Sequence, residues 1–259
     1  MADESTFTDS LRLLAAKGLR YSTVMDLGCA DGHFFLQHFN LGLLAGAVPV
    51  NVDANSIYED SLKAIRDTLG GSYVIAAVTD HVGEVELTIG SHPYWSSLLV
   101  EKDSYWQRMN KLHRGKVKVP GVTVDSLARQ LGLLPPFLLK LDIQGAERAV
   151  LNGARETLKQ TDVVICEIDL ADFHDLDRLM DDAGFSLFDI TVLRRMTDGS
   201  LGWFYPVYLN RRRDGIRNRT LWDPSVNEAV TEMQRKRRQE ILEYNARVLA
   251  ALRKARGER

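Results

Sequence analysis

Cysteine is scarce in this sequence: its 259 residues include only Cys29 and Cys166, both in or beside predicted buried strands. A disulfide framework would need more cysteines, so we expect two reduced, buried side chains in an intracellular protein. No apolar run approaches the roughly 20 residues that cross a membrane, and the polar, acidic start MADESTFTDS contains no secretory signal. These absences predict a cytoplasmic protein without a membrane span.

A strong excess of one charge is also missing, because the formal net charge is only −2. The positive residues gather after Asn210, and the run Arg235-Lys236-Arg237-Arg238 alone suggests nucleic-acid binding. Such runs more often form a solvated helix face, so a nucleic-acid partner is not expected. We predict one α/β domain over residues 1–210, followed by a basic linker and a charged helix over residues 211–259.

The most informative pattern is a short apolar stretch that ends on a carboxylate. Residues 137–141 read FLLKL, which is typical of a strand buried on both faces of a parallel sheet. Asp142 follows directly, and a helical pattern begins after Gly145. Because open α/β sheets bind ligands at the carboxyl ends of their strands, we expect Asp142 at a ligand site.

A strand, a glycine turn and a helix are also predicted over residues 23–43. Gly28 is expected to let the backbone approach a ligand, and Gly32 to allow a sharp entry into the helix. The amides at the start of that helix attract a carboxylate. Asp26 and Asp31 flank the turn. This unit is the first of a nucleotide-binding type of fold.

The next predicted strand, residues 48–53, ends in Asp53. A carboxylate at this tip is placed to accept hydrogen bonds from both hydroxyls of a ribose. The arrangement serves NAD enzymes and methyltransferases alike. Asp53 therefore indicates a nucleoside without deciding the cofactor.

A further buried strand, over residues 162–168, brings Glu167 to the same sheet edge as Asp142. Two such carboxylates suit either a base that takes a hydroxyl proton or a shared metal site. Helix amides, Lys140 or Arg148 would equally hold the pair in a purely structural role. The sequence leaves the metal question open.

Residues 91–120 interrupt the regular alternation and are rich in aromatic and basic side chains. A long irregular segment of this kind inside a compact domain predicts a lid or a substrate loop. Its histidines, His92 and His113, are candidate bases, and we retain His113 as a candidate catalytic residue.

Three blocks, VTVDSLARQ, LLKLDIQGAERAVLNGA and VVICEI, occur in this order. Together they resemble the signature region of the FkbM-type S-adenosylmethionine-dependent methyltransferases, over about residues 20–210 when the glycine loop near Asp26 is included. One departure is Gln144, where many members carry Glu, and this removes one acid from the site.

The resemblance implies a Rossmann-like class I methyltransferase fold, an α/β sheet of seven strands with the last one antiparallel, flanked by helices and followed by a C-terminal helical tail. It implies S-adenosylmethionine as cofactor and an expected cofactor site made of Asp26, Gly28, Asp31, Gly32, Asp53, Asp80 and Asp142. In this site Asp80 would accept the adenine amino group, although Asp80 fits the start of a hairpin turn equally well.

The resemblance also implies O-methyl transfer to a hydroxyl of a sugar, a glycan or a secondary metabolite. A base then removes the hydroxyl proton during attack. Asp142 is the first candidate for this base, and Glu167, Glu147 and His113 are the next ones.

Two patterns favour this cofactor over NAD. Ala30 occupies the middle place of the G-x-G-x-x-G fingerprint, and two flanking acids would repel a pyrophosphate but suit a sulfonium and an ammonium. Asp198-Gly199 predicts a hairpin where a dinucleotide-binding sheet needs a helix. An NAD-dependent oxidoreductase stays as an alternative, as does a non-catalytic scaffold that acts through its C-terminal helix.

A partly apolar stripe runs through the charged segment from Val226 to Leu252. This helix would pack back on the domain, pair with a second subunit or extend as a solvated arm. Self-association through it is therefore one of three expectations.

Overall fold

The structure is a computed structural model that describes residues 6–89, 96–97, 115–216, 239 and 243. Residues up to Ile216 belong to one compact unit, which contains every element described below. His113 and nearly all of the predicted C-terminal helix lie outside the described residues. The division into domains at residue 210 therefore stays a prediction.

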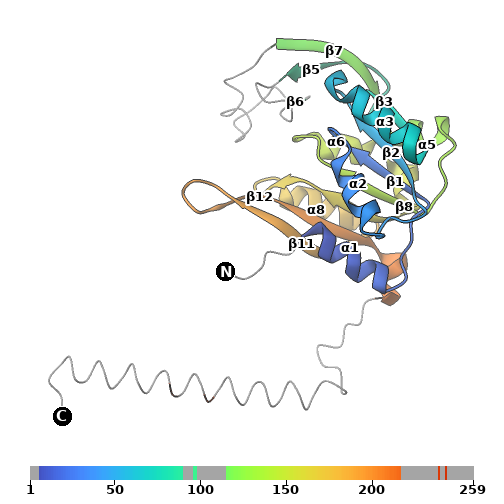
Figure 1. Ribbon diagram of the computed structural model, residues 1–259. Helices are drawn as coiled ribbons and strands as arrows, with labels where there is room; N and C mark the ends of the chain where they lie inside the picture. Colours follow the sequence, from blue (N-terminus) through green and yellow to red (C-terminus); the bar gives the residue numbers. More distant parts are fainter. Residues whose placement is uncertain (1–5, 90–95, 98–114, 217–238, 240–242, 244–259) are drawn as a thin grey trace. The chain divides into compact units, whose positions relative to one another are not determined.

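A mostly parallel sheet forms the centre of this unit (Figure 1). Its strands follow the order β10-β12-β9-β8-β1-β2-β3, and β11 pairs with β12. Their bounds are β1 Thr23–Leu27, β2 Val48–Asp53, β3 Ser72–Ile75, β8 Phe137–Leu141, β9 Thr161–Cys166, β10 Ile168–Asp169, β11 Phe185–Arg195 and β12 Leu201–Asn210. Neighbours from β3 to β9 are parallel, whereas β12 is antiparallel to β9 and to β11. This confirms the predicted α/β class with its antiparallel closing strand, and the two-residue β10 is an addition.

Helices cover both faces of the sheet (Figure 1). One face carries α1 Phe7–Ala16, α2 His33–Asn40 and α3 Glu59–Leu69, the last entered through the 3₁₀ turn η1 Ser56–Tyr58; the other carries α5 Val124–Gln130, α6 Glu147–Asn152, α7 Arg155–Leu158 and α8 Phe173–Asp182. A second 3₁₀ segment, η3 Arg211–Ile216, follows β12.

The alternation of strand side chains divides the core between these two faces. Met25 and Leu27 of β1 belong to the cluster that includes α5–α8, and Val24 belongs to the cluster that includes α1 and α2. By the same alternation Asp26 faces the side of α1 and α2. Asp26 is in register with Lys140 of β8, so the pairing of two strands places two charged residues next to each other.

A second sheet was not predicted. It has the order β4-β7-β5-β6, with β4 Ala77–Val78, β5 Gly83–Ile89, β6 Ser96–Ser97 and β7 Gly115–Val122. Residues 73–78 form one apolar run that is typical of a single strand, but the chain leaves the main sheet after Ile75, and β4 pairs with β7 instead. Residues 115–120, expected in the lid, belong to the strand β7, and most of the lid lies outside the described residues.

Cys29 and Cys166 are both buried free thiols, as the sequence predicted. Within the part of the chain that the structure describes, we find no helix with the length and apolar character needed to cross a bilayer.

Candidate functional site

A cavity of about 610 Å³ opens at the carboxyl end of the main sheet. Gly28, Asp53, Asp142 and Glu167, each at or just after the end of its strand, line it together. The residues predicted from four separate strand ends therefore meet in one cavity. This is the position at which open α/β sheets bind ligands.

The glycine loop adopts left-handed backbone conformations, with φ of 72° at Gly28 and 81° at Gly32, the N-cap of α2. A Cβ on Gly28 would lie 2.0 Å from the carbonyl oxygen of Asp142. Glycine is thus required here because the loop after β8 crosses this backbone, in addition to the expected approach of a ligand. A Cβ on Gly32 would meet Ile65 at 2.3 Å, so Gly32 also brings α3 close to the loop.

Asp53 lies on the cavity wall and is held by two backbone amides. Its Oδ2 accepts a hydrogen bond from Ala30 N and its Oδ1 one from Asn55 N, each at 2.8 Å. Burial raises the pKa of Asp53 above its usual value, and the two amides oppose this rise. The apolar wall nearby is formed by Val52, Ala54, Ala76, Ala77, Val78 and Leu87.

Lys140 lies in the buried strand β8, and only 6% of its surface is exposed. Its Nζ is 3.2 Å from Asp26 Oδ1 and 3.3 Å from Asp142 Oδ2, and it donates to the carbonyl of Gly28 at 3.3 Å. Burial opposes its charge, but the two carboxylates prevail and raise the pKa of Lys140 above its usual value. Lys140 is therefore a buried ammonium that joins β1, β8 and the glycine loop.

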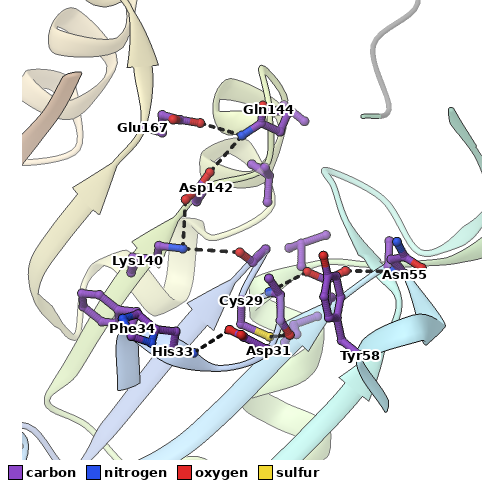
Figure 2. A pocket seen from close by; sticks show the side chains of 18 of the residues that line it. Cys29, Asp31, His33, Phe34, Asn55, Tyr58, Lys140, Asp142, Gln144 and Glu167 are labelled. Carbon is purple, nitrogen blue, oxygen red and sulfur yellow. Dashed lines mark hydrogen bonds and ion pairs between the residues drawn. The ribbon is translucent and has the colours of Figure 1, made fainter. Parts of the chain in front are cut away.

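Asp142 and Glu167 are bridged on two sides. Gln144 Nε2 is 3.0 Å from Asp142 Oδ1 and 2.7 Å from Glu167 Oε2. Tyr205 Oη is 2.9 Å from Asp142 Oδ2 and 3.0 Å from Glu167 Oε1. Figure 2 shows the chain of contacts that runs from Glu167 through Gln144 and Asp142 to Lys140.

The two carboxyl groups have opposite tendencies. Burial acts to raise the pKa of Asp142, but the charge of Lys140 and side-chain hydrogen bonds, that of Tyr205 among them, bring it below its usual value. Burial and the charge of Asp142 raise the pKa of Glu167 well above its usual range. The surroundings therefore favour the ionised form of Asp142 and the neutral form of Glu167.

Glu147, the first residue of α6, is buried and does not line the cavity. Its Oε1 accepts a hydrogen bond from Gly145 N at 3.1 Å, so it holds the loop after β8. Burial raises the pKa of Glu147 to about 7.

Aromatic side chains form another part of the wall. Phe7 of α1 contacts Tyr205 edge-on, with ring centroids 4.7 Å apart, and also contacts Phe34 at 6.0 Å. Trp203 and the polar side chains of His33 and Gln37 line the cavity as well. Helix α1 therefore contributes Phe7 to the wall of the cavity.

The predicted site residues differ in where they lie. Gly28, Asp31, Asp53, Asp142 and Glu167 line the cavity, and Gly32 supports the loop from outside.

Asp26 and Asp80, in contrast, do not line the cavity. Asp26 is fully buried, contacts Lys140, and has no hydrogen bond to either carboxylate oxygen among the described residues. Asp80 has an exposed side chain, and a hydrogen bond from His81 Nδ1 at 2.7 Å lowers its pKa.

Sequence reasoning named Lys140 only as one possible structural partner of the Asp142–Glu167 pair, and it missed Tyr205. A lysine inside an apolar run, at the same strand height as Asp26, was the available signal for Lys140. No local signal indicated Tyr205, because only the antiparallel placement of β12 brings it to Asp142.

S-adenosylmethionine fits this arrangement of residues. Asp53 offers a carboxylate at the tip of β2, and apolar side chains lie beside it. The glycine loop leads directly into the N-terminus of α2. The total negative charge of the site is smaller than the sequence suggested, because Lys140 pairs with both Asp26 and Asp142. Acids alone therefore do not account for selection of a cationic cofactor.

No curated protein matches the sequence. Among solved structures, an FkbM methyltransferase from Methylobacillus flagellatus KT has 16% identity and a TM-score of 0.46, with 78% of this chain and 48% of that chain covered. This chain thus spans about half the length of that protein.

Two other structures are similar at a comparable level. A precorrin-6y C5,15-methyltransferase from Geobacter metallireducens GS-15 has 8% identity and a TM-score of 0.41, covering 78% of this chain and 88% of that one. TrmK of M. capricolum, solved with S-adenosyl-homocysteine, has 8% identity and a TM-score of 0.42, covering 77% and 67%. Similarities this weak support no assignment of substrate.

A family model matches most of the described domain. The family model described as the methyltransferase FkbM domain matches residues 26–187, more than half of the chain. The match begins at Asp26 in β1 and includes the glycine loop, Asp53, Asp142 and Glu167. The chain therefore belongs to the FkbM methyltransferase family.

Proposed function

We propose that this protein is an S-adenosylmethionine-dependent O-methyltransferase that acts on a hydroxyl of a sugar, a glycan or a secondary metabolite. The observation that carries the proposal is the carboxylate of Asp142 on the cavity wall. It is held by Lys140, Gln144 and Tyr205 at the carboxyl end of the sheet. Family membership supports methyl transfer, and the hydroxyl acceptor is our inference.

The cofactor is S-adenosylmethionine, as the resemblance to the S-adenosylmethionine-dependent FkbM methyltransferases implies and membership of that family supports. We assign the ribose to Asp53, the adenine to the neighbouring apolar wall and the amino-acid part to the loop of Gly28, Asp31 and Gly32. Asp26 would act on the cofactor only through Lys140. A contact between Asp80 and adenine stays part of the proposal and requires the exposed side chain to turn inward.

When bound, this cofactor supplies an electrophilic methyl group. Asp142 accepts the proton that the acceptor hydroxyl loses. A carboxylate with a lowered pKa is adequate, because a hydroxyl oxygen becomes strongly acidic as it forms its new bond to carbon. The remaining contribution of the chain is alignment of the acceptor and exclusion of water by the cavity walls.

The aromatic part of the wall supports a ring-shaped acceptor. Phe7, Phe34 and Trp203 offer flat apolar surfaces, and His33 and Gln37 offer polar groups beside them. Sugar rings and flat secondary metabolites both suit such a wall. The role of His113 as a base stays a proposal, since this residue lies outside the described part of the chain.

The test is transfer of isotopically labelled methyl groups to candidate extracts, followed by mass spectrometry and NMR of the labelled product. We expect an O-methyl ether. D142N should lower kcat by about 10²–10⁴-fold, the usual contribution of general acid–base catalysis. D175N, which removes an exposed carboxylate of α8, is the matched control and should keep its activity. Label on nitrogen or carbon would contradict O-methylation while leaving family membership intact.

An NAD-dependent oxidoreductase is less well supported. The described chain has an antiparallel β11–β12 pair, where a dinucleotide-binding sheet would continue in parallel.

A cytoplasmic location and self-association through the C-terminal helix belong to the proposal as well. Gel filtration of the full chain and of a form that ends at Ile216 would test the second point.

A further inference from the structure

The side chains of Asp142, Gln144, Glu167 and Tyr205 form a closed ring of hydrogen bonds. Each carboxyl group uses one oxygen toward Gln144 Nε2 and the other toward Tyr205 Oη, with all four distances between 2.7 and 3.0 Å. We call this set the carboxyl ring. Both carboxyl groups line the cavity.

A count of protons favours one neutral carboxyl group in this ring. The amide group of Gln144 has two hydrogens and can donate one to each carboxyl. The hydroxyl of Tyr205 has one hydrogen, yet it lies within hydrogen-bond distance of both carboxyl groups. The fourth contact needs another hydrogen, and a carboxylic acid is the group that can provide it.

The surroundings decide which carboxyl group carries this hydrogen. Asp142 is 3.3 Å from the ammonium of Lys140, which favours its ionised form. Glu167 is 8% exposed and forms no ion pair with a lysine or arginine of the described residues. The titratable groups that act on Glu167 are Asp142, Glu147 and Tyr205, and the two acids both oppose its ionisation.

We propose that Glu167 is a neutral carboxylic acid that donates to the Tyr205 oxygen, so that Tyr205 donates to Asp142 and only Asp142 carries the negative charge of the carboxyl ring. Gln144 and Tyr205 are positioning residues in this assignment. Only the use of Asp142 as a base rests on the proposed function; the proton positions do not.

The assignment gives Gln144 a specific role. Its amide donates to both carboxyl groups, whereas a glutamate at this position would offer oxygens where hydrogens are needed. The backbone of Gln144 has a φ of 57°, a left-handed conformation that is uncommon for residues other than glycine. The loop therefore holds a strained residue whose amide closes the carboxyl ring.

The direct test is ¹³C NMR of protein labelled at the glutamate side-chain carboxyl carbon. The Glu167 signal is the one that disappears in E167Q. We expect this signal to have the chemical shift of a neutral acid at pH 6 and to move toward the ionised position only at higher pH. An ionised shift already at pH 6 would overturn the proposal, whether or not the protein transfers methyl groups.

A second test compares the stability of E167Q and the wild type by urea unfolding between pH 5 and pH 8. A neutral Glu167 has a folded-state pKa above its unfolded value, so its contribution to stability falls as pH rises through this range. The amide introduced by E167Q does not titrate and can still donate to Tyr205. The unfolding constant of the wild type divided by that of E167Q should therefore rise by up to about tenfold per pH unit.

Lys140, Asp142 and Glu147 are present in both proteins of this comparison, so their own titrations largely cancel. E147Q is the control for the neighbouring buried acid. In this variant the NMR titration should still show a pKa of Glu167 above its usual value. A ratio of unfolding constants that stays constant with pH would contradict a neutral Glu167.

Discussion

Lys140 is the residue that most clearly connects stability to the site. A cation inside an apolar strand is costly unless it is paired, and Lys140 contacts two carboxylates and one carbonyl. Removal of the ammonium leaves Asp26 fully buried and without a partner charge. The local sequence FLLKL is stable as a strand because neighbouring strands supply these partners.

We therefore expect K140M to lower the free energy of unfolding by about 3–5 kcal/mol, the usual cost of breaking a buried ion pair. The double variant D26N/K140M should recover part of this loss, because it also removes the uncompensated charge. K116M is the control, since Lys116 pairs with Glu86 on the surface and should matter by about 1 kcal/mol or less. Equal effects of K140M and K116M in urea unfolding would show that the buried pairs contribute little.

At this scale the sequence predicted the acids of the site better than their partners. Asp53, Asp142 and Glu167 were found because each ends an apolar strand, and strand ends can be read from local pattern. Lys140 and Tyr205 depend on which strands become neighbours and in which register. These are properties of the folded sheet that no local stretch contains.

At the scale of elements, the turn between β1 and α2 depends on contact with a distant loop. Gly28 was predicted from the motif, but its closest neighbour is the backbone of Asp142 rather than a ligand. Asp125 gives a similar lesson. Its position at the start of α5 is typical of a helix cap, but Thr123 caps α5, and Asp125 accepts hydrogen bonds from the amides of Glu156 and Thr157 at the start of α7.

G28A should therefore be far more damaging than an alanine at another left-handed glycine. G46A introduces only the conformational cost of about 1–2 kcal/mol, because a Cβ there has no neighbour within 4 Å. G28A adds a collision with a carbonyl oxygen, and we expect a loss of stability several times larger or a failure to fold. Similar melting temperatures for the two variants would show that the loops after β1 and β8 separate easily.

For the molecule as a whole, the class of the sheet and its antiparallel closing strand were the most predictable properties. Apolar strands alternate with amphipathic helices, and a hairpin ends the described domain, so the pattern alone points to a parallel sheet with an antiparallel closing strand. The second sheet was missed because β4 and β7 are far apart in sequence, and β4 has only two residues. The cavity follows from the main sheet, whereas its aromatic part depends on α1 and β12.

The most direct test of the central claim is calorimetric titration with S-adenosylhomocysteine and, separately, with NADH. We predict that the wild type binds S-adenosylhomocysteine and not NADH. D53A should raise the Kd at least tenfold, because hydrogen bonds to a charged carboxylate contribute about 1.5–3 kcal/mol each. D67A, which removes an exposed acid of α3, should bind like the wild type. Binding of NADH alone, or an unchanged Kd in D53A, would contradict a methyltransferase cofactor site at this end of the sheet.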